Sequence, residues 1–204
     1  MTELAVLQAV RLKGRVNPAD LAATLGADFR DIAPVVERLT VAGLLTEGAT
    51  LRITGSGSDR LGTLLAQERE DIDPAAIAGA YDDFRAVNAD FKHLVTDWQV
   101  KGGPDGVPNA HDDADYDAAV LARLDDVHTR AMPIIAAAAA QLPRLSSYAT
   151  KLAAALDKVR AGDTAWLTRP LIDSYHTVWF ELHEELIVAT GLTREEAARS
   201  GDAQ

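Results

Sequence analysis

Short helices separated by glycine are predicted over the first part of the chain. Apolar positions recur at helical spacing in three stretches, at about residues 3–12, 18–25 and 29–42. Asn17-Pro18 and Asp28 are typical helix starts, because Asn and Asp side chains accept a free N–H and proline fits the first turn. Three short helices are therefore expected at the N-terminal end.

A hairpin and a fourth helix are predicted to follow. Apolar runs at residues 44–46 and 51–54 flank a turn that contains Gly48. Two short strands joined by such a turn are typical of a β-hairpin. Ser56 or Ser58 is placed to cap the fourth helix.

Long helices are predicted for the rest of the chain, which carries no strand signal after residue 73. Their expected ranges are 73–101, 115–140, 142–160 and 170–190, with a short last turn from Thr193. Pro133 is expected to kink or break the second of them. Four long helices with short links favour an antiparallel bundle. The sequence thus predicts a mostly α fold with domains at residues 1–70 and 71–204.

The order helix, helix, turn, helix, hairpin, helix is that of a winged helix-turn-helix. Residues 3–70 resemble the DNA-binding core of MarR-type bacterial regulators. The resemblance lies in three motifs, Leu21-Ala22-x-x-Leu25-Gly26, Val36-Glu37-Arg38-Leu39-x-x-x-Gly43-Leu44-Leu45 and Ile53-Thr54-Gly55-Ser56-Gly57. It implies a recognition helix near residues 29–42 and a wing, with Arg30, Arg38 and Arg52 as the DNA-binding residues, although the wing here is shorter than is usual in that family and offers Arg52 alone.

The charge of this segment departs from the usual pattern of a DNA-binding domain. Residues 1–70 hold eight basic and nine acidic residues, whereas contacts with phosphate normally supply much of the affinity for DNA. Asp31 and Pro34 stand where the recognition helix would face the groove. A homodimer that aligns the few arginines is therefore expected if the domain binds DNA. The alternative is a winged helix used for dimerisation or protein contact.

Polar residues interrupt the apolar seams of the predicted bundle. The seam of the first bundle helix contains Asn88 and ends at Trp98, and those of two later helices contain His128 and the pair His176 and His183. All four polar residues fall near the middles of their helices, so we expect them at one level. They form either a closed internal network or a pocket for a polar small molecule, with Trp98 and Trp179 among its apolar walls.

Metal binding and catalysis are not predicted. His176 and His183 are seven residues apart, which separates their backbones by about 10.5 Å along one helix and disfavours a shared ion. Cysteine is absent, and there is no glycine-rich phosphate loop or nucleophile motif. No cofactor, no metal and no enzymatic activity are therefore expected, although an enzyme built in the bundle stays a third, weaker alternative.

The whole-chain composition indicates a cytoplasmic protein with no membrane partner. The net charge is −11, and neither a signal peptide nor a long apolar run is visible. Residues 91–99 and 173–186 look like a helical segment near the end of some actinobacterial phosphoenolpyruvate-utilising proteins. The favoured function is a homodimeric transcriptional regulator that binds DNA and a small-molecule effector. The alternative is a non-DNA-binding module for small-molecule or protein binding, accessory to a phosphoenolpyruvate-utilising system.

Overall fold

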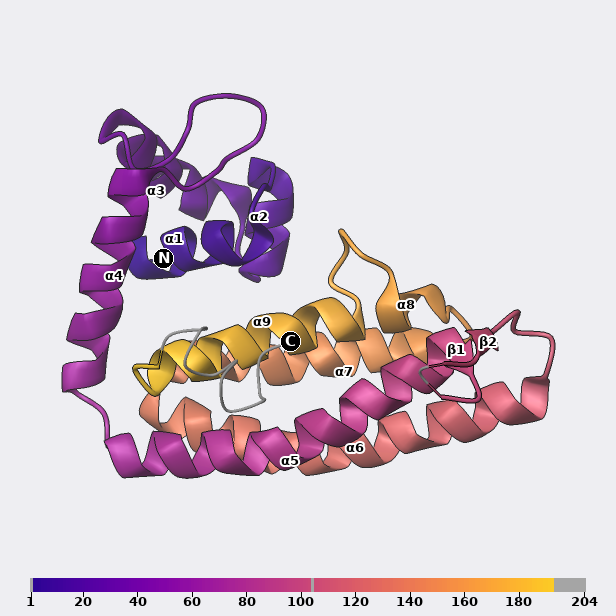
Figure 1. Ribbon diagram of the computed structural model, residues 1–204. Helices are drawn as coiled ribbons and strands as arrows, with labels where there is room; N and C mark the ends of the chain where they lie inside the picture. The colour runs from indigo at the N-terminus through magenta and orange to yellow at the C-terminus, as the bar shows by residue number, and fades with distance from the viewer. Residues whose placement is uncertain (1, 104, 193–204) are drawn as a thin grey trace. The chain divides into compact units, whose positions relative to one another are not determined.

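The computed structural model describes residues 2–103 and 105–192 and is mostly α-helical (Figure 1). The chain divides into two compact units, of which the first is Met1–Ile72 and the second begins at Asp73. Each unit has its own apolar core. No helix in the described part of the chain is both long enough and apolar enough to cross a bilayer.

Four α-helices build the first unit. They are α1 (Glu3–Lys13), α2 (Pro18–Thr24), α3 (Phe29–Val41) and α4 (Gly55–Glu70). The predicted helix starts at Asn17 and Asp28 are confirmed, since the Asn17 side chain accepts the N–H of Asp20 and the Asp28 side chain accepts that of Arg30. The core of this unit is made by apolar side chains from all four helices, among them Leu7, Leu21, Ile32 and Leu61.

The start of α4 differs from the prediction, because Thr54 caps it rather than Ser56 or Ser58. Thr54 Oγ1 accepts the N–H of Gly57 at 3.0 Å and donates to the carbonyl of Gly43 at 2.7 Å. A Cβ atom at Gly57 would lie 2.1 Å from the carbonyl oxygen of Leu44. Glycine is therefore required where α4 passes the preceding segment.

The expected hairpin between α3 and α4 is reduced to isolated β-bridges. Leu45 pairs with Ile53, and Leu51 pairs with Val16, which precedes α2. The predicted strands at 44–46 and 51–54 are thus shorter than expected. Leu45 and Leu51 are nevertheless buried, so this segment closes the core of the first unit.

Longer helices build the second unit. They are α5 (Pro74–Gln99), α6 (Ala114–Gln141), the 3₁₀ helix η1 (Pro143–Ser146), α7 (Ser147–Arg160), α8 (Ala165–Thr168) and α9 (Tyr175–Ala189). Figure 1 shows α6 returning alongside α5, and α9 packs against both α5 and α7. The Gln141 side chain at the end of α6 accepts the N–H of Asp73 at the start of α5, at 3.0 Å. The apolar core of the unit lies between these helices.

The expectation that no strand follows residue 73 is wrong. Strand β1 (Val100–Lys101) pairs antiparallel with β2 (Val107–Pro108). A Cβ atom at Gly106 would lie 1.9 Å from the carbonyl oxygen of Lys101, so only glycine fits this turn. The link between α5 and α6 therefore contains a small hairpin, whose first strand occupies the end of the predicted helix 73–101.

One predicted helix boundary of the second unit also changes, and Pro133 does not break its helix. Pro133 lies inside an uninterrupted α6, whose neighbouring residues Ala131 and Ile134 are buried in the core. The last described helix begins at Tyr175 rather than near Pro170, because the Ser174 side chain accepts the N–H of Thr177 and caps it. The expected turn at Thr193 lies outside the described residues.

Candidate functional site

A cavity of about 300 Å³ lies between α5 and α9 in the second unit. Four of the residues predicted to bind a ligand line it, namely Asn88, His176, Trp179 and His183. The other lining residues are Phe91, Lys92, Val95, Thr96, Gln99 and Phe180. The structure thus brings most of the predicted site together at one place.

The hydrogen bond between Trp179 and Asn88 fixes one side of the cavity. Trp179 Nε1 donates to Asn88 Oδ1 at 2.9 Å, and both side chains are buried. An indole N–H can only donate, so the acceptor must be the amide oxygen and the orientation of the amide is not ambiguous. The NH₂ group is therefore the part of Asn88 that is left for the cavity.

Aromatic rings form the apolar wall. Phe91 packs against Trp179 with ring centroids 4.6 Å apart and against His176 with centroids 6.0 Å apart. Deeper in the unit, the ring of His183 lies 5.4 Å from that of Phe84. Partial burial lowers the pKa of His176 below its ordinary value, which favours a neutral imidazole at neutral pH.

Three polar rim residues were missed by the sequence reasoning. Lys92, Thr96 and Gln99 follow Asn88 along α5 at helical spacing and so share its face. Thr96 Oγ1 donates to the carbonyl of Lys92 at 2.9 Å. The available signal was the polar stripe that these residues form beside the apolar seam.

His128 does not join the cavity, contrary to the expectation of one shared level. Its Nδ1 lies 3.2 Å from the hydroxyl of Tyr175, a side chain with no exposed surface. Burial, and then the positive charge of Arg160, lower the pKa of His128. The imidazole and the tyrosine hydroxyl are therefore hydrogen-bonded to each other, with a direction that depends on the imidazole tautomer. The seam of α6 indicated that His128 faces inward, but not which neighbouring helix it meets.

Trp98 is also absent from the cavity, and it belongs to a separate cluster at the β1–β2 hairpin. The rings of Trp98 and His111 are 4.4 Å apart. The Asn109 side chain donates to the carbonyl of Trp98 at 3.1 Å and to the carboxylate of Asp117 at 2.9 Å. These bonds hold the link between α5 and α6. Trp98 lies at the last turn of α5, too far along the helix to reach Asn88.

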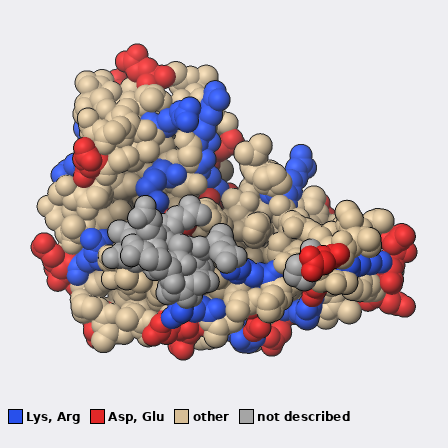
Figure 2. Space-filling model, viewed as in Figure 1, with Lys and Arg blue, Asp and Glu red and all other residues tan. Residues whose placement is uncertain are grey.

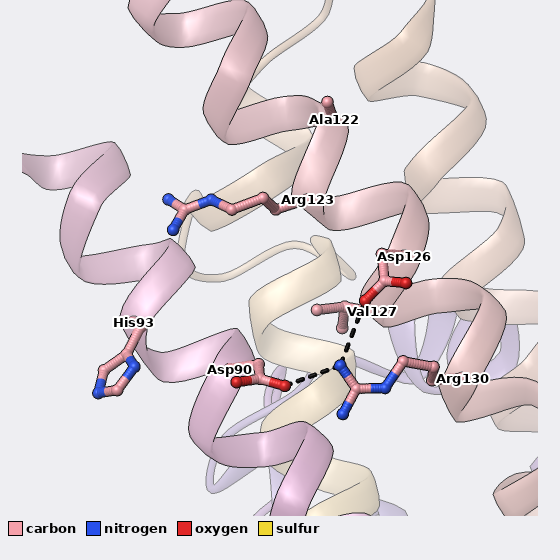
Figure 3. A pocket seen from close by; sticks show the side chains of 7 residues that line it. All are labelled: Asp90, His93, Ala122, Arg123, Asp126, Val127 and Arg130. Atoms are coloured by element: carbon pink, nitrogen blue, oxygen red, sulfur yellow. Dashed lines mark hydrogen bonds and ion pairs between the residues drawn. The ribbon is translucent and has the colours of Figure 1, made fainter.

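A second cavity, of about 380 Å³, lies between α5 and α6 (Figure 3). Figure 3 shows Arg130 reaching from α6 to Asp90 on α5, at 2.7 Å, and to Asp126 on its own helix, at 3.2 Å. Arg123 is likewise paired with Asp97 at 2.7 Å. Both arginines are thus neutralised by carboxylates.

Basic side chains on the surface of the second unit also lie close to carboxylates. In Figure 2, basic and acidic side chains are interspersed along this unit. Arg160 on α7 and Asp125 on α6 form one such pair at 2.7 Å. No group of three or more His, Cys, Asp or Glu residues in the described part of the chain is placed to hold a metal ion.

The predicted DNA-binding arginines of the first unit are all exposed. Arg30 forms an ion pair with Asp28 at 2.9 Å, and this pair lowers the pKa of the Asp28 carboxyl. Arg38 lies on α3, and Arg52 lies between the two bridge positions Leu51 and Ile53. One of the three arginines therefore already has a partner close to the start of α3.

A third cavity, of about 310 Å³, lies beside α3 in the first unit. Its walls include Val36, Thr40 and Val41 from α3, together with Glu47 and Gly48 from the segment that follows. Val41 is one of the few strongly exposed large apolar residues, at 83%. This face of α3 is therefore more apolar and acidic than basic.

Comparison with known proteins adds no relative. No protein family matches the chain, and neither a curated protein nor a solved structure is significantly similar to it.

Proposed function

We propose that the chain is a DNA-binding transcriptional regulator whose helical second unit senses a small molecule. The single observation that carries the proposal is the pairing, in one chain, of two complementary parts. One is a helical unit with exposed arginines on α3 and on the segment after it. The other is a helical unit with a cavity lined by Asn88, His176 and Trp179. Ligand-responsive regulation needs both.

The arrangement of the first unit supports a winged helix-turn-helix. Helix α2 is followed by a tight turn at Gly26, which has a φ of +60°, and then by α3. The bridges Leu45–Ile53 and Leu51–Val16 supply the short wing. In this proposal α3 is the recognition helix of a MarR-like domain.

The charge of the first unit limits the affinity of a single copy for DNA. Arg38 and Arg52 are exposed, whereas Arg30 must exchange Asp28 for a phosphate. A homodimer doubles these contacts, to six arginines on two half-sites. Releasing about six counterions gives a slope of about −5 for log K against log salt concentration. Binding is therefore expected to be weak at physiological salt and strong only at low salt.

The test is titration of the full chain against fluorescent DNA from upstream of its own gene, at several salt concentrations. Arg38→Gln/Arg52→Gln is expected to weaken binding and to reduce the slope. Arg60→Gln on α4 removes one positive charge from the same unit, as Arg38→Gln and Arg52→Gln each do alone, and it is the matched control for these single variants, because Arg60 pairs with Glu3. Two results contradict the proposal. One is DNA binding whose affinity does not change with salt concentration, and the other is an equal loss of affinity in the Arg60 control and in the Arg38 and Arg52 variants.

A specific observation favours the alternative of a non-DNA-binding module. Asp31, Pro34, Glu37 and Val41 are exposed on α3, and they line a face suited to protein contact. Under this alternative, which includes an accessory role in a phosphoenolpyruvate-utilising system, both units bind small molecules or proteins. Absence of DNA binding at about 50 mM salt, together with retained ligand binding by the second unit, supports it.

A further inference from the structure

We infer that the cavity between α5 and α9 binds a small organic carboxylate that carries a flat ring. The ring lies on Phe91 and Trp179, and the carboxylate is held by the side chains of Asn88 and Lys92. The inference rests on the proposed sensing role of the second unit and names the chemical class that it senses. It does not depend on whether the first unit binds DNA.

The first step is the free donor of Asn88. Its side chain is only 7% exposed, and its oxygen is committed to Trp179. None of the described residues forms a hydrogen bond with the Asn88 NH₂ group. The nitrogen keeps contact with solvent through the cavity, so a bound ligand that supplies an acceptor oxygen takes the place of water at this donor. The cavity therefore selects an acceptor at this position.

The second step is the positive charge on the rim. Lys92 lies one turn after Asn88 on α5, and no carboxylate among residues 2–103 and 105–192 pairs with its ammonium group. None of the ten described residues that line the cavity is Asp or Glu. The chain as a whole has a net charge of −11, and both arginines of the α5–α6 cavity are neutralised by aspartates. A lining that contains a cation and no acid suits an anionic ligand.

The third step is the shape and polarity of the wall. The rings of Phe91 and Trp179 are 4.6 Å apart and tilted by 36° to each other, Val95 adds an aliphatic side, and Phe180 is partly exposed at the rim. Aromatic faces favour a second flat ring in an offset or tilted stack. A volume of about 300 Å³ is at the lower end of ligand pockets and accommodates one or two fused rings.

The donor set distinguishes a carboxylate from a phosphate ester. One amide NH₂ group and one ammonium group can each serve one oxygen of a carboxylate. A phosphate dianion carries more charge and a third oxygen, and it is typically met by arginine or by a helix N-terminus. Lys92 and Asn88 both lie in the interior of α5, the first turn of α9 contributes only the His176 side chain to the lining, and the lining contains no arginine. The geometry thus favours the carboxylate.

The experiment is calorimetric titration of the full chain with indole-3-acetate and with its neutral counterpart, indole-3-acetamide. The carboxylate is expected to bind at least about tenfold more tightly, which is the discrimination of one lost charged hydrogen bond. Equal binding of the two compounds overturns the inference. Tighter binding of phenyl phosphate than of phenylacetate overturns the choice of carboxylate.

Two variants locate the site. Asn88→Asp keeps an acceptor for Trp179 and replaces the donor with a negative charge, and Lys92→Met keeps the aliphatic stem and removes the cation. Each is expected to weaken binding of indole-3-acetate by about tenfold or more. Lys101→Met, in the hairpin outside the cavity, is the matched control and should bind as wild type does. Unchanged affinity in both cavity variants, with the wild-type circular dichroism spectrum, places the ligand elsewhere and overturns the inference.

Failure of the inference and failure of the proposed function give different results. If benzoate, phenylacetate and indole-3-acetate all fail to bind while DNA binding stays salt-dependent, the ligand class is wrong and the regulator proposal stands. If the carboxylates bind at this cavity and DNA does not bind, the inference stands and the second unit belongs to a module of another kind.

Discussion

Removing Arg144 is expected to destabilise the second unit strongly, because it leaves a buried carboxylate without its closest cation. Arg144 in η1 donates to Glu185 Oε2 on α9 at 2.6 Å, and the hydroxyl of Tyr148 lies 3.4 Å from the other carboxylate oxygen. The side chain of Glu185 is 4% exposed and that of Arg144 is 19% exposed. The pair therefore ties α9 to the segment that leads into α7.

The magnitude follows from the difference in exposure. Breaking a buried ion pair by removing one partner costs about 3–5 kcal/mol. Arg144→Met keeps the aliphatic stem and removes the positive charge that lies 2.6 Å from the more buried partner, so we expect a loss of about 3 kcal/mol in the free energy of unfolding. Glu185→Gln leaves Arg144 able to reach water and keeps a group that can bond to Tyr148, so its cost should be about 1–2 kcal/mol.

The double variant Arg144→Met/Glu185→Leu distinguishes the cost of leaving one charge of the ion pair behind from the cost of lost side-chain packing. Replacing both charges with apolar groups of similar volume is often neutral relative to the native pair. The double variant should therefore be more stable than Arg144→Met alone, and the two single effects should not add.

Urea denaturation followed by tryptophan fluorescence measures this directly. All three tryptophans of the chain, Trp98, Trp166 and Trp179, lie in the second unit, so the signal reports that unit alone. A loss of less than about 1 kcal/mol in Arg144→Met refutes the reasoning, because it lies below the range for a broken buried pair. Additive effects within about 0.5 kcal/mol would show that the two residues act independently.

Four further predictions follow from other contacts. His128→Ala should cost about 1–3 kcal/mol by stranding the Tyr175 hydroxyl and should leave the affinity for indole-3-acetate unchanged; a loss of affinity would place His128 at the ligand. Because partial burial lowers the pKa of His128, the unfolded chain takes up the proton first as the pH falls. The contribution of this residue to stability is therefore complete above about pH 6.5 and is lost below it, and urea midpoints at pH 7.5 and pH 5 should differ less in His128→Gln than in wild type. Gly57→Ala should cost about 1–3 kcal/mol by forcing a Cβ against the backbone of Leu44, whereas Gly55→Ala in the same turn meets no atom within 4 Å and should be near neutral by thermal melting. Sedimentation should give a dimer, and a monomer of 21.8 kDa at micromolar concentration would contradict both the dimer and the regulator.

Local signals in the sequence predicted the helix starts, and distant contacts decided the elements that it missed. Asn17, Asp28 and Asp73 cap helices through bonds to residues two or three positions ahead, so a short window contains the information. Thr54 caps α4 through Gly57, three positions ahead, but Ser56 and Ser58 are equally good cap residues in the same window, and the bond from the Thr54 hydroxyl to the carbonyl of Gly43, eleven positions earlier, fixes the choice. The bridge from Leu51 to Val16 depends on the packing of the whole first unit in the same way.

The candidate site shows the same division between local and distant information. Heptad spacing predicted that Asn88, His176 and His183 face inward, and the structure places all three at one cavity. Spacing along one helix does not specify which neighbour an inward residue meets. For that reason it could not foresee that His128 pairs with Tyr175.

Two hydrogen bonds on opposite partners restrict how α9 can move. Trp179 ties it to α5 through Asn88, and Glu185, less than two turns later, ties it to Arg144 beside α7. Rotation of α9 about its own axis would break both bonds at once. A ligand that binds between α5 and α9 would therefore tilt α9 about its fixed point at Glu185. The end of the helix at Tyr175 would move away from α5, and the helix would not rotate about its axis.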